Sequence, residues 1–535
     1  MSLSTCSACG STVCNPAGSD LDSIVPGATP WTLMRCQQLA TTNEVPNSAE
    51  VAFARDLISR TSVRLTSLDD EILALEDRLE HLKAKRAKLF KYHSDNVSVL
   101  SPLRRMPFEL LAEIFSWSLP SRQKRGDASS VERSPWILAR ICSRWRQVAV
   151  STPSLWSTIK AIYGVAGVPQ LAMIRTQVER ARRSLKICFH GSENVDSSSQ
   201  LELFQFLSEH SAQWEVLNMQ LTTALVPLLG TLRGRLPSLR KLILDWDKAE
   251  SQVGVDSIKC FETAPSLRDV SIQPRGPGVR FIPVPFPSHQ LTTYRLIGPW
   301  ETHQRILQMA PNLVEARLVV LCDNAAVWPV PSSLTITLPH LERLHVTRVE
   351  ALNYLRAPKL AELGVWIKEP GSLITTLDAF LLRSSCTPYR LCVEGLPHAP
   401  TTAEILEKYA FFTSLTIIYG FKGSRAVAGL DGHLTMLDRG DHPVLPHLTE
   451  ISFGSLSRNI PVDYPLFLKM LQSRRRTVGP SALTSAAFIN LKGLEPDAVT
   501  LAGLNDLSRD GLRLVLGSHV AAKSTFKRWT LSVGS

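Results

Sequence analysis

The sequence predicts a mixed α/β protein made of an N-terminal coiled-coil helix, a small all-helical module and an irregular α/β solenoid. Three observations lead to this prediction. A heptad pattern of apolar residues runs over residues 49–95, two amphipathic segments lie within residues 100–160, and a leucine-containing motif recurs over residues 161–535. Residues 1–48 are rich in Ser, Thr, Pro, Asn and Gly without apolar periodicity, so we expect a disordered tail there.

The composition is that of a globular protein that folds in water. The chain has 535 residues, of which 44% are hydrophobic, and this is enough to bury a large core. No stretch approaches the roughly 18 uninterrupted apolar residues that cross a bilayer, and the N-terminus does not resemble a signal peptide. Most of the ten cysteines are scattered in apolar surroundings, as buried free thiols are. We therefore expect a soluble protein of the cytoplasm or nucleus without membrane contact.

Three cysteines in the N-terminal tail have the close spacing of metal ligands. Cys6 and Cys9 are separated by two residues and Cys14 follows, but a structural zinc site needs four ligands. The next cysteine is Cys36, and no histidine lies near. We expect a flexible tail without metal, with a zinc site as the alternative, and we expect no cofactor elsewhere.

The net charge of +11 raises the question of an acidic partner such as a nucleic acid. The basic residues are spread along the chain, and the short basic runs at 83–91, 122–125 and 474–476 contain no aromatic residue except Phe90. Non-specific nucleic-acid binding commonly combines a basic groove with stacking aromatic side chains. The basic residues are therefore interpreted as solvated surface, and nucleic-acid binding is kept only as an alternative.

Between residues 49 and 95, apolar side chains recur in alternating steps of three and four residues. This spacing is typical of the a and d positions of successive heptads, and neither Gly nor Pro interrupts it. A helix with so narrow an apolar stripe needs a second helix to cover it, so we expect a coiled coil and homo-oligomers through residues 58–89. The alternative is a single helix docked on the module that follows. The stripe consists of Ile58, Leu65, Leu68, Ile72, Leu75, Leu79, Leu82 and Leu89, with Thr61 and Arg86 in its two gaps.

Two amphipathic helices are predicted between residues 100 and 160. Pro107 suits the first turn of a helix, because the N–H group that proline lacks has no helical partner there. Apolar residues at helical spacing follow and end near Pro120. Residues 121–134 are polar and are expected to form a solvent-exposed loop, and a second helix is predicted for Trp136–Val150.

The remainder of the chain contains a degenerate repeat whose copies begin roughly 19 to 35 residues apart. Proline ends a preceding helix, and the leucines after it form a short strand with alternate side chains in the core. Helix-like runs at 301–309, 372–383 and 403–412 separate some copies. Repeated strands and helices give a curved solenoid with a parallel sheet on its inner side. The clearest copies are LPSLRKLIL at residue 236, APSLRDVSI at 264, APNLVEARL at 310, LPHLERLHV at 338, APKLAEL at 357 and LPHLTEI at 445, and weaker copies lie at 291–294, 389–393 and 415–417.

Residues 100–160 resemble an F-box. The segment 103–117 (LRRMPFELLAEIFSW) is similar to its opening, 134–148 (SPWILARICSRWRQV) to its second half, and 152–156 (TPSLW) to its end. Met106 replaces the leucine of the family's opening Leu-Pro pair, and the polar loop separates the halves by about ten residues more than in a compact F-box, an insertion of low cost.

The repeats resemble irregular leucine-rich repeats that lack the asparagine many of them share, and a compact α/β domain is the alternative. The combination of heptad helix, F-box-like module and repeats is similar to a large group of F-box-like proteins found in mushroom-forming fungi.

The resemblance implies a substrate-recruiting adaptor of an SCF-type ubiquitin ligase, in which the F-box docks onto the Skp-type linker and the linker bridges to a cullin. An F-box is too small to bury both faces of its helices, so its remaining apolar surface is the docking site. By match to the family's motif, the partner-binding residues are Leu103, Pro107, Leu110, Leu111, Ile114, Phe115, Ile141, Trp145, Leu155 and Trp156. The first six are expected to contact the linker and the last four to shape the module. An unknown protein substrate is expected on the inner sheet, where the candidate contacts are the solvent-facing residues Arg240, Lys241, Arg268, Glu342, Arg343 and Glu362.

We expect the chain to have no catalytic activity of its own. It lacks His-Glu-x-x-His, Walker-type and Gly-x-Ser-x-Gly motifs, and His81 and His345 are interpreted as surface residues rather than general bases. The alternative function is a non-catalytic scaffold or interaction protein that oligomerises through its coiled coil and has no part in a ligase.

Overall fold

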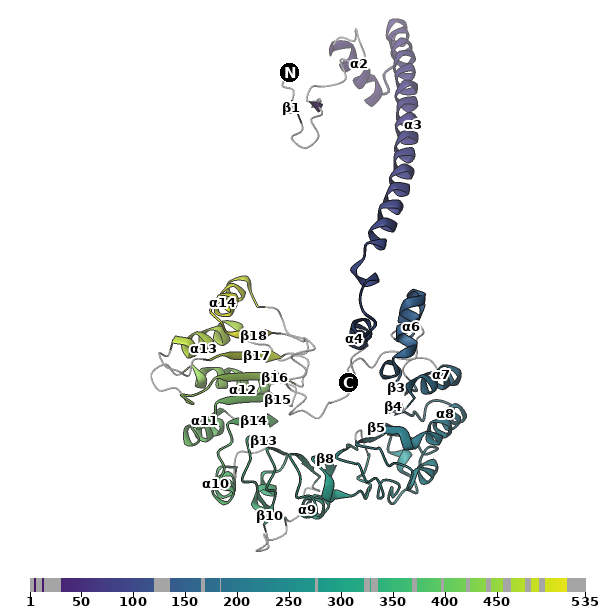
Figure 1. Cartoon of the computed structure of the whole chain (residues 1–535). Coiled ribbons are helices and arrows are strands. Elements are labelled where there is room, and N and C mark those ends of the chain that lie inside the picture. Colours follow the sequence, from purple (N-terminus) through teal and green to yellow (C-terminus); the bar gives the residue numbers. More distant parts are fainter. Residues whose placement is uncertain are drawn as a thin grey trace. The chain divides into compact units, whose positions relative to one another are not determined.

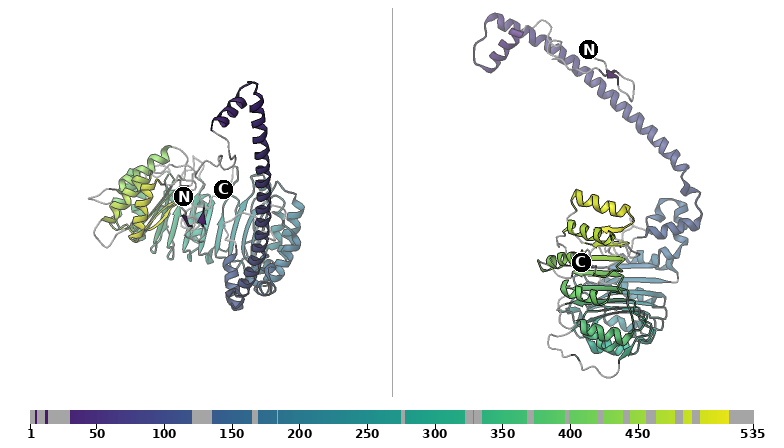
Figure 2. Two further views of the ribbon diagram at one scale, coloured as in Figure 1. Left: turned by 90° about the horizontal axis from the view of Figure 1, so that it is seen from above. Right: turned by 90° about the vertical axis from the view of Figure 1, so that its left-hand side faces the viewer.

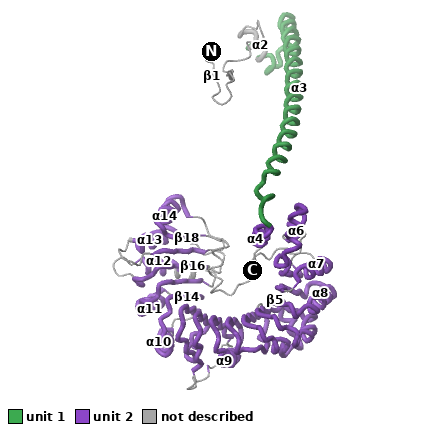
Figure 3. The backbone as a smooth tube through the Cα atoms, in the orientation of Figure 1, with its two compact units in different colours: residues 1–107 green, residues 108–535 purple. Residues whose placement is uncertain are grey.

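A computed structural model of the chain comprises two compact units, residues 1–107 and residues 108–535 (Figure 3). The residues that it describes are 4–5, 12–13, 30–119, 135–164, 169–182, 184–274, 278–321, 328, 335–367, 373–395, 399–419, 424–438, 444–455, 463–476, 483–489 and 496–516.

The first unit contains a short helix before the long one. Its elements are β1 (Ser4–Thr5), β2 (Thr12–Val13), α2 (Pro30–Thr41), α3 (Ser48–Val99) and the 3-10 turn η1 (Pro102–Arg104). Arg35 on α2 forms ion pairs with Glu44 at 2.8 Å and with Glu50 on α3 at 3.0 Å, so the two helices are tied together. The expectation of a tail without regular structure up to residue 48 is therefore wrong over α2. Pro30 at the first helical position is a start signal that the sequence contained.

The long helix α3 begins at a capping box. The Asn47 side chain accepts a hydrogen bond from the Glu50 amide at 2.8 Å, and the Glu50 carboxylate accepts one from the Asn47 amide at 2.8 Å. The helix then runs for 52 residues to Val99, which confirms the helix predicted for residues 49–95. It has no buried residue, so no described residue of the first unit covers its apolar stripe. Pairing with a second helix stays a prediction.

The second unit starts with a group of short helices. Its elements are α4 (Phe108–Ser118), α5 (Leu138–Ile141), α6 (Ser143–Ser151) and the 3-10 turn η2 (Pro153–Leu155). The single helix predicted for Trp136–Val150 is wrong, because the backbone is extended at Cys142 (φ −156°) and separates α5 from α6. Cys142 Sγ accepts a hydrogen bond from the Trp145 amide at 3.4 Å and so caps α6. The predicted loop 121–134 lies outside the described residues.

The rest of the second unit is built on one parallel sheet of 14 strands (Figure 1). Their order in the sheet follows their order in the chain, without the reversal that a doubly wound domain has at its switch point. The strands are β3 (Thr158–Ile162), β4 (Leu185–His190), β5 (Trp214–Leu221), β6 (Lys241–Trp246), β7 (Asp269–Ile272), β8 (Thr293–Gly298), β9 (Glu315–Val320), β11 (Arg343–Val346), β13 (Glu362–Ile367), β14 (Arg390–Gly395), β15 (Ser414–Tyr419), β16 (Glu450–Ser455), β17 (Ser485–Ile489) and β18 (Arg513–Leu516). A separate parallel pair is formed by β10 (Ile336–Thr337) and β12 (Leu355–Arg356).

The sheet curves, and helices lie along its outer side (Figures 1 and 2). They are α7 (Leu171–Ala181), α8 (Ser197–Glu209), α9 (Trp300–Gln308), α10 (Leu373–Ser384), α11 (Ala399–Lys408), α12 (Ser424–Leu437), α13 (Tyr464–Arg476) and α14 (Ala498–Arg509). The helix-like runs predicted at 301–309 and 372–383 are confirmed by α9 and α10. The third, predicted for 403–412, is displaced by four residues to α11.

The recurring sequence motif sets where the strands begin. In the six clear copies, each strand starts five residues after the leading Leu or Ala, as β6 does after Leu236 and β11 after Leu338. The amide of the second leucine donates to the carbonyl of the leading residue, at 3.5 Å from Leu239 and at 3.3 Å from Leu341. Proline occupies the second position of this turn, where its fixed φ is favoured. The strands predicted from the motif are confirmed.

Alternate strand positions supply the core between sheet and helices. Leu344 on β11 pairs in register with Ala316 on β9 and with Leu363 on β13, and all three side chains are buried. Because side chains alternate along a strand, Arg343 and His345 project from the opposite, inner face. Among the described residues, none of the helices combines the length and the apolar character that a bilayer crossing needs.

Candidate functional site

The ten predicted partner-binding residues separate into an exposed and a buried set. Leu103 and Pro107 belong to the first unit and the other eight to the second. Leu111, Phe115, Leu155 and Trp156 are buried, Trp145 is half-buried, and Leu103, Pro107, Leu110, Ile114 and Ile141 are exposed. Only the exposed residues are available to a partner.

Helix α4 presents apolar side chains on two faces that lie about 100° apart around its axis. Leu110 and Ile114 are 55% and 42% exposed, and Trp117, which is 82% exposed, follows them at the spacing of one helical face. The adjacent residues Leu111 and Phe115 point inward and are fully buried. An exposed apolar face of this kind on a small module marks an interaction surface. We call Leu110, Ile114 and Trp117 the outer face of α4.

The buried set holds the helical module together. The rings of Phe115 and Trp145 pack with centroids 4.8 Å apart, which joins α4 to α6. Trp156 Nε1 donates a hydrogen bond to the Ala149 carbonyl at 2.7 Å, and both residues are buried. Trp145 and Trp156 therefore hold the module together.

An aromatic joint connects the module to the first strands of the sheet. Trp136 and Trp156 meet edge to face at 5.0 Å, and the guanidinium of Arg180 on α7 lies over the two rings, 5.3 Å and 4.4 Å from their centroids. The module is thus packed onto the region that begins the sheet. We call these three residues the aromatic joint.

Sequence reasoning missed four exposed apolar residues of the module. The helical spacing of Leu110, Ile114 and Trp117 was a usable signal for one of them. The pairs at 110–111 and 114–115 are both apolar, however, so sequence alone did not say which member faces inward. The missed residues are Phe108, Trp117, Ile137 and Val150, which are between 39% and 82% exposed.

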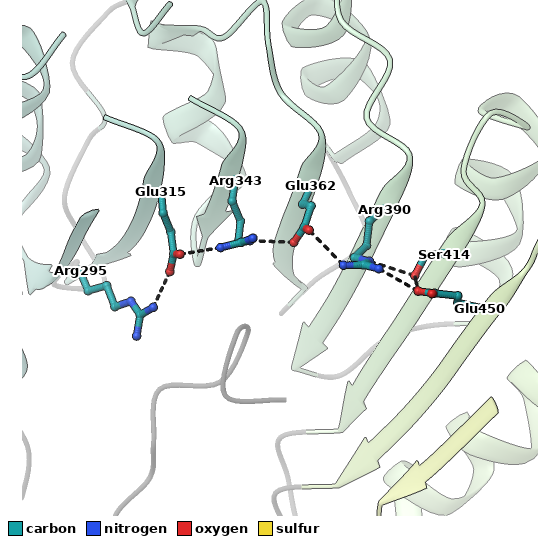
Figure 4. Close-up of polar contacts among 7 residues, drawn as sticks. All are labelled: Arg295, Glu315, Arg343, Glu362, Arg390, Ser414 and Glu450. Carbon is teal, nitrogen blue, oxygen red and sulfur yellow. Dashed lines mark hydrogen bonds and ion pairs between the residues drawn. The ribbon is translucent and has the colours of Figure 1, made fainter. Parts of the chain in front are cut away.

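The inner face of the sheet carries a row of alternating charges along the first position of successive strands (Figure 4). Glu315, Arg343, Glu362 and Arg390 are register partners on β9, β11, β13 and β14. Arg343 contacts Glu315 at 2.6 Å and Glu362 at 2.7 Å, and Arg390 contacts Glu362 at 3.0 Å. Opposite charges directly across a strand pair stabilise a sheet. We call these four residues the charged row.

At both ends of the charged row, further ion pairs connect it to residues that are not direct register partners. Arg295 on β8 pairs with Glu315, and Arg390 passes Ser414 on β15 to reach Glu450 on β16 at 2.8 Å. Arg390 Nε also donates to Ser414 Oγ at 3.1 Å. Although burial acts to raise the pKa of Glu315, its two arginine partners lower that pKa below its usual value. Glu315 is therefore held in its charged form, and the ion pairs of the row lie largely between its own members.

A second polar cluster is buried on the same face. Glu394 on β14 accepts a hydrogen bond from His345 Nε2 at 2.8 Å and contacts Arg317 at 3.3 Å, and all three are at most 4% exposed. Gly364 on β13 lies in register between His345 and Cys392, and because it has no side chain the Glu394 carboxylate reaches across that strand. Burial, and then the charge of Arg317, lowers the pKa of His345. The interpretation of His345 as a surface residue is wrong, whereas His81 is exposed.

The six candidate substrate contacts differ in exposure. Arg240, Arg268 and Glu342, which immediately precede β6, β7 and β11, are exposed, and Lys241 and Arg343 are half-buried. Lys241 forms an ion pair with Asp269. Glu362 is 5% exposed, so the expectation that it faces solvent is wrong: it lies between two arginines of the charged row.

In the part of the chain that the structure describes, no three His, Cys, Asp or Glu side chains are grouped to hold a metal ion. The zinc alternative rests on Cys6, Cys9, Cys14 and Cys36, whose side chains lie outside the described residues. No protein-family model matches the chain, and no curated protein matches it significantly.

Proposed function

We propose that this chain is a substrate-recruiting adaptor of an SCF-type ubiquitin ligase, in which an F-box formed by the helical module docks onto a Skp-type linker that bridges to a cullin. The observation that carries the proposal is the outer face of α4. Leu110 and Ile114 are exposed while their neighbours Leu111 and Phe115 form the core. The F-box-like motif thus has a folded interior and an apolar surface left over for a partner.

The separation of the two faces also decides which substitutions test docking. A charge at Leu111 would be buried without a partner and would unfold the module, since this side chain is fully buried. A charge at Leu110 or Ile114 enters solvent and leaves the core intact. The variant Leu110→Glu/Ile114→Glu is therefore the informative one.

The experiment is retention of the full-length chain on an immobilised Skp-type linker. Wild type is expected to be retained, and Leu110→Glu/Ile114→Glu is expected to be lost while its unfolding transition stays unchanged. Leu382→Glu on α10 is the matched control, because Leu382 is 83% exposed and lies outside the module. A wild-type chain that is not retained would remove the ligase role.

The inner face of the leucine-rich-repeat-like sheet is the proposed position of the protein substrate. The residues of the charged row form ion pairs with one another, and a partner that binds them would have to compete with these ion pairs. The exposed residues Arg240, Arg268 and Glu342 beside the strand starts form no ion pair with another described residue, so a partner can contact them without displacing one. We therefore propose that the substrate contacts the margin of the inner face rather than its centre.

The scaffold function is the second candidate, and the uncovered stripe of α3 favours it. A chain that self-associates through α3 but is not retained by the linker would fit a scaffold and not an adaptor. The two functions are separated by the same linker experiment combined with a measurement of molecular mass.

A further inference from the structure

The apolar stripe of α3 is uncovered over most of its length. Seven of its eight apolar members are between 52% and 63% exposed, and the eighth, Leu68, is half-buried. Toward its C-terminal end, Leu82, Arg86, Leu89 and Phe90 line an open hollow on the helix surface. A stripe of this length exceeds what a solvated helix leaves exposed, and coiled-coil helices bury such stripes against one another.

The short helix α2 covers only the beginning of α3. The ion pair between Arg35 and Glu50 places α2 beside the first turns, where Val51, Phe53 and Leu57 are half-buried. From Ile58 onward the stripe is open. The free surface therefore starts at Ile58 and continues to Leu89, and α2 does not compete for it.

The stripe is complementary to itself when a second copy runs antiparallel. In that arrangement, a positions of one helix face d positions of the other. With Ile72 placed opposite Leu75 of the second copy, every apolar member meets an apolar member. The remaining layers are Leu68 with Leu79, Leu65 with Leu82, Ile58 with Leu89, and Thr61 with Arg86.

The two polar members of the stripe, Thr61 and Arg86, indicate the orientation of the pair. In the antiparallel register, Arg86 faces Thr61 of the second copy, and the two polar gaps coincide. The hydroxyl of Thr61 donates to the Leu57 carbonyl at 2.8 Å, so its oxygen lone pairs are free to accept from a guanidinium. One polar pair in an apolar seam is a recognised device for fixing register and orientation.

A parallel, in-register pair of helices places the same polar residues unfavourably. It stacks Arg86 against Arg86 of the second copy in the seam, where two like charges repel and neither finds an acceptor. The flanking charges do not separate the two orientations, because each sets some like charges opposite one another. The seam arginine therefore decides the orientation.

We infer that the partner of α3 is a second copy of this chain, paired antiparallel with Ile72 opposite Leu75 and Thr61 opposite Arg86. The two C-terminal ends of α3 then lie roughly 75 Å apart, since the 52-residue helix rises about 1.5 Å per residue. The helical module and the sheet follow α3 in the chain, so each copy contributes one helical module and one inner face to the dimer.

The substitution Thr61→Glu separates the orientations. In the antiparallel dimer it places a carboxylate opposite Arg86 twice, and the dissociation constant is expected to fall by about five- to tenfold. In a parallel dimer it places two carboxylates opposite each other, and the dissociation constant rises. Sedimentation of the full-length chain over a concentration series measures the change.

The matched control is Thr66→Glu. Thr66 lies on the same helix outside the stripe, is exposed, and bonds to the carbonyl of Ser62 at 3.0 Å much as Thr61 bonds to Leu57. This control is expected to leave the dissociation constant unchanged. A second readout uses Leu65→Cys mixed with Leu82→Cys, whose intermolecular disulfide between positions 65 and 82 is expected after mild oxidation.

A chain that stays monomeric at all concentrations, or a Thr61→Glu variant that dimerises more weakly, would overturn the inference. So would a disulfide between two copies of position 65. The measurement contains no linker protein, so its failure leaves the proposed docking function untouched, and failure of linker binding leaves this dimer untouched.

Discussion

Helix α3 and the parallel sheet both place leucines at regular intervals, but only the sheet buries them. On the sheet, Leu344 is fully buried between its register partners, whereas Leu75 on α3 is 59% exposed. A strand in the repeat region receives a neighbour from the next copy of its own motif. The heptad helix has no second copy of itself among the described residues of the first unit, and the partner that we propose for it is another chain.

The same contrast holds for charge. Inside the sheet, Glu362 is held by two arginines within 3.0 Å. On α3, the ion pair of Lys83 with Glu80 is exposed on both sides and has little effect on stability. The difference teaches that repetition stabilises a segment only when the repeats contact each other. We expect changes in the sheet to alter folding and changes on α3 to alter assembly.

The largest expected effect comes from a matched pair of leucines. Leu344→Ala should lower the free energy of unfolding of the sheet by about 3.5 kcal/mol, because it leaves a cavity in a fully buried layer. Leu75→Ala should leave that free energy unchanged and instead weaken self-association. Urea unfolding followed by tryptophan fluorescence measures the first effect. Equal destabilisation by both substitutions would contradict the contrast.

The next largest expected effect is a loss of stability at low pH caused by the buried histidine His303 on α9. His303 Nδ1 lies 3.0 Å from the Tyr294 hydroxyl, and burial lowers the pKa of His303 to about 4. Below a pH of about 6.5 the unfolded chain binds a proton at this residue and the folded chain does not, so stability falls as pH drops toward about 4. The total loss is at most about 3.4 kcal/mol.

Unfolding free energies measured between pH 7 and pH 4 test this expectation. His303→Leu should reduce the slope against pH, whatever its effect on stability at neutral pH. The exposed residue His289 is the control, since His289→Gln should keep the wild-type slope. An unchanged slope in His303→Leu would show that other groups cause the acid sensitivity.

Much of the fold was predictable because its signals are local. One short motif contains both the turn from Leu236 to Leu239 and the start of β6, five residues after Leu236. The helix α3 is likewise fixed by spacing within the chain. The break at Cys142 was not predictable, because the apolar spacing continues through it and only the extended backbone and the sulfur cap end α5 there.

The polar groups of the inner face were harder to predict. Arg343 and Glu362 were recognised as strand positions, but their pairing needs the register between copies whose spacing varies along the chain. The burial of His345 depends on Glu394, which is two strands away in the sheet. A glycine at position 364 makes that reach available, and nothing in the local sequence reveals it.

An intermediate effect is expected from the charged row. Glu362→Gln keeps the shape of the side chain but removes the charge shared by Arg343 and Arg390, each of which retains one other carboxylate. Because both arginines are partly exposed, the expected loss is about 2 kcal/mol rather than that of a fully buried pair. Chemical denaturation gives the value. Glu262→Gln, whose exposed partner Arg233 lies 3.6 Å away, should show no measurable change.

The smallest expected effect tests how far the helical module shares the stability of the sheet. Arg180→Met removes the guanidinium from the aromatic joint and should cost about 1 kcal/mol. Hydrogen exchange at the amides of α6 should then accelerate about fivefold while exchange at β11 stays unchanged, because the joint holds only the module. Arg175→Met, which loses a contact with Phe206 outside the joint, should leave α6 unaffected. Equal acceleration in α6 and β11 would mean that module and sheet open together as one unit. In that case the module would share the stability of the sheet, and only α3 would differ from the sheet in how its leucines are covered.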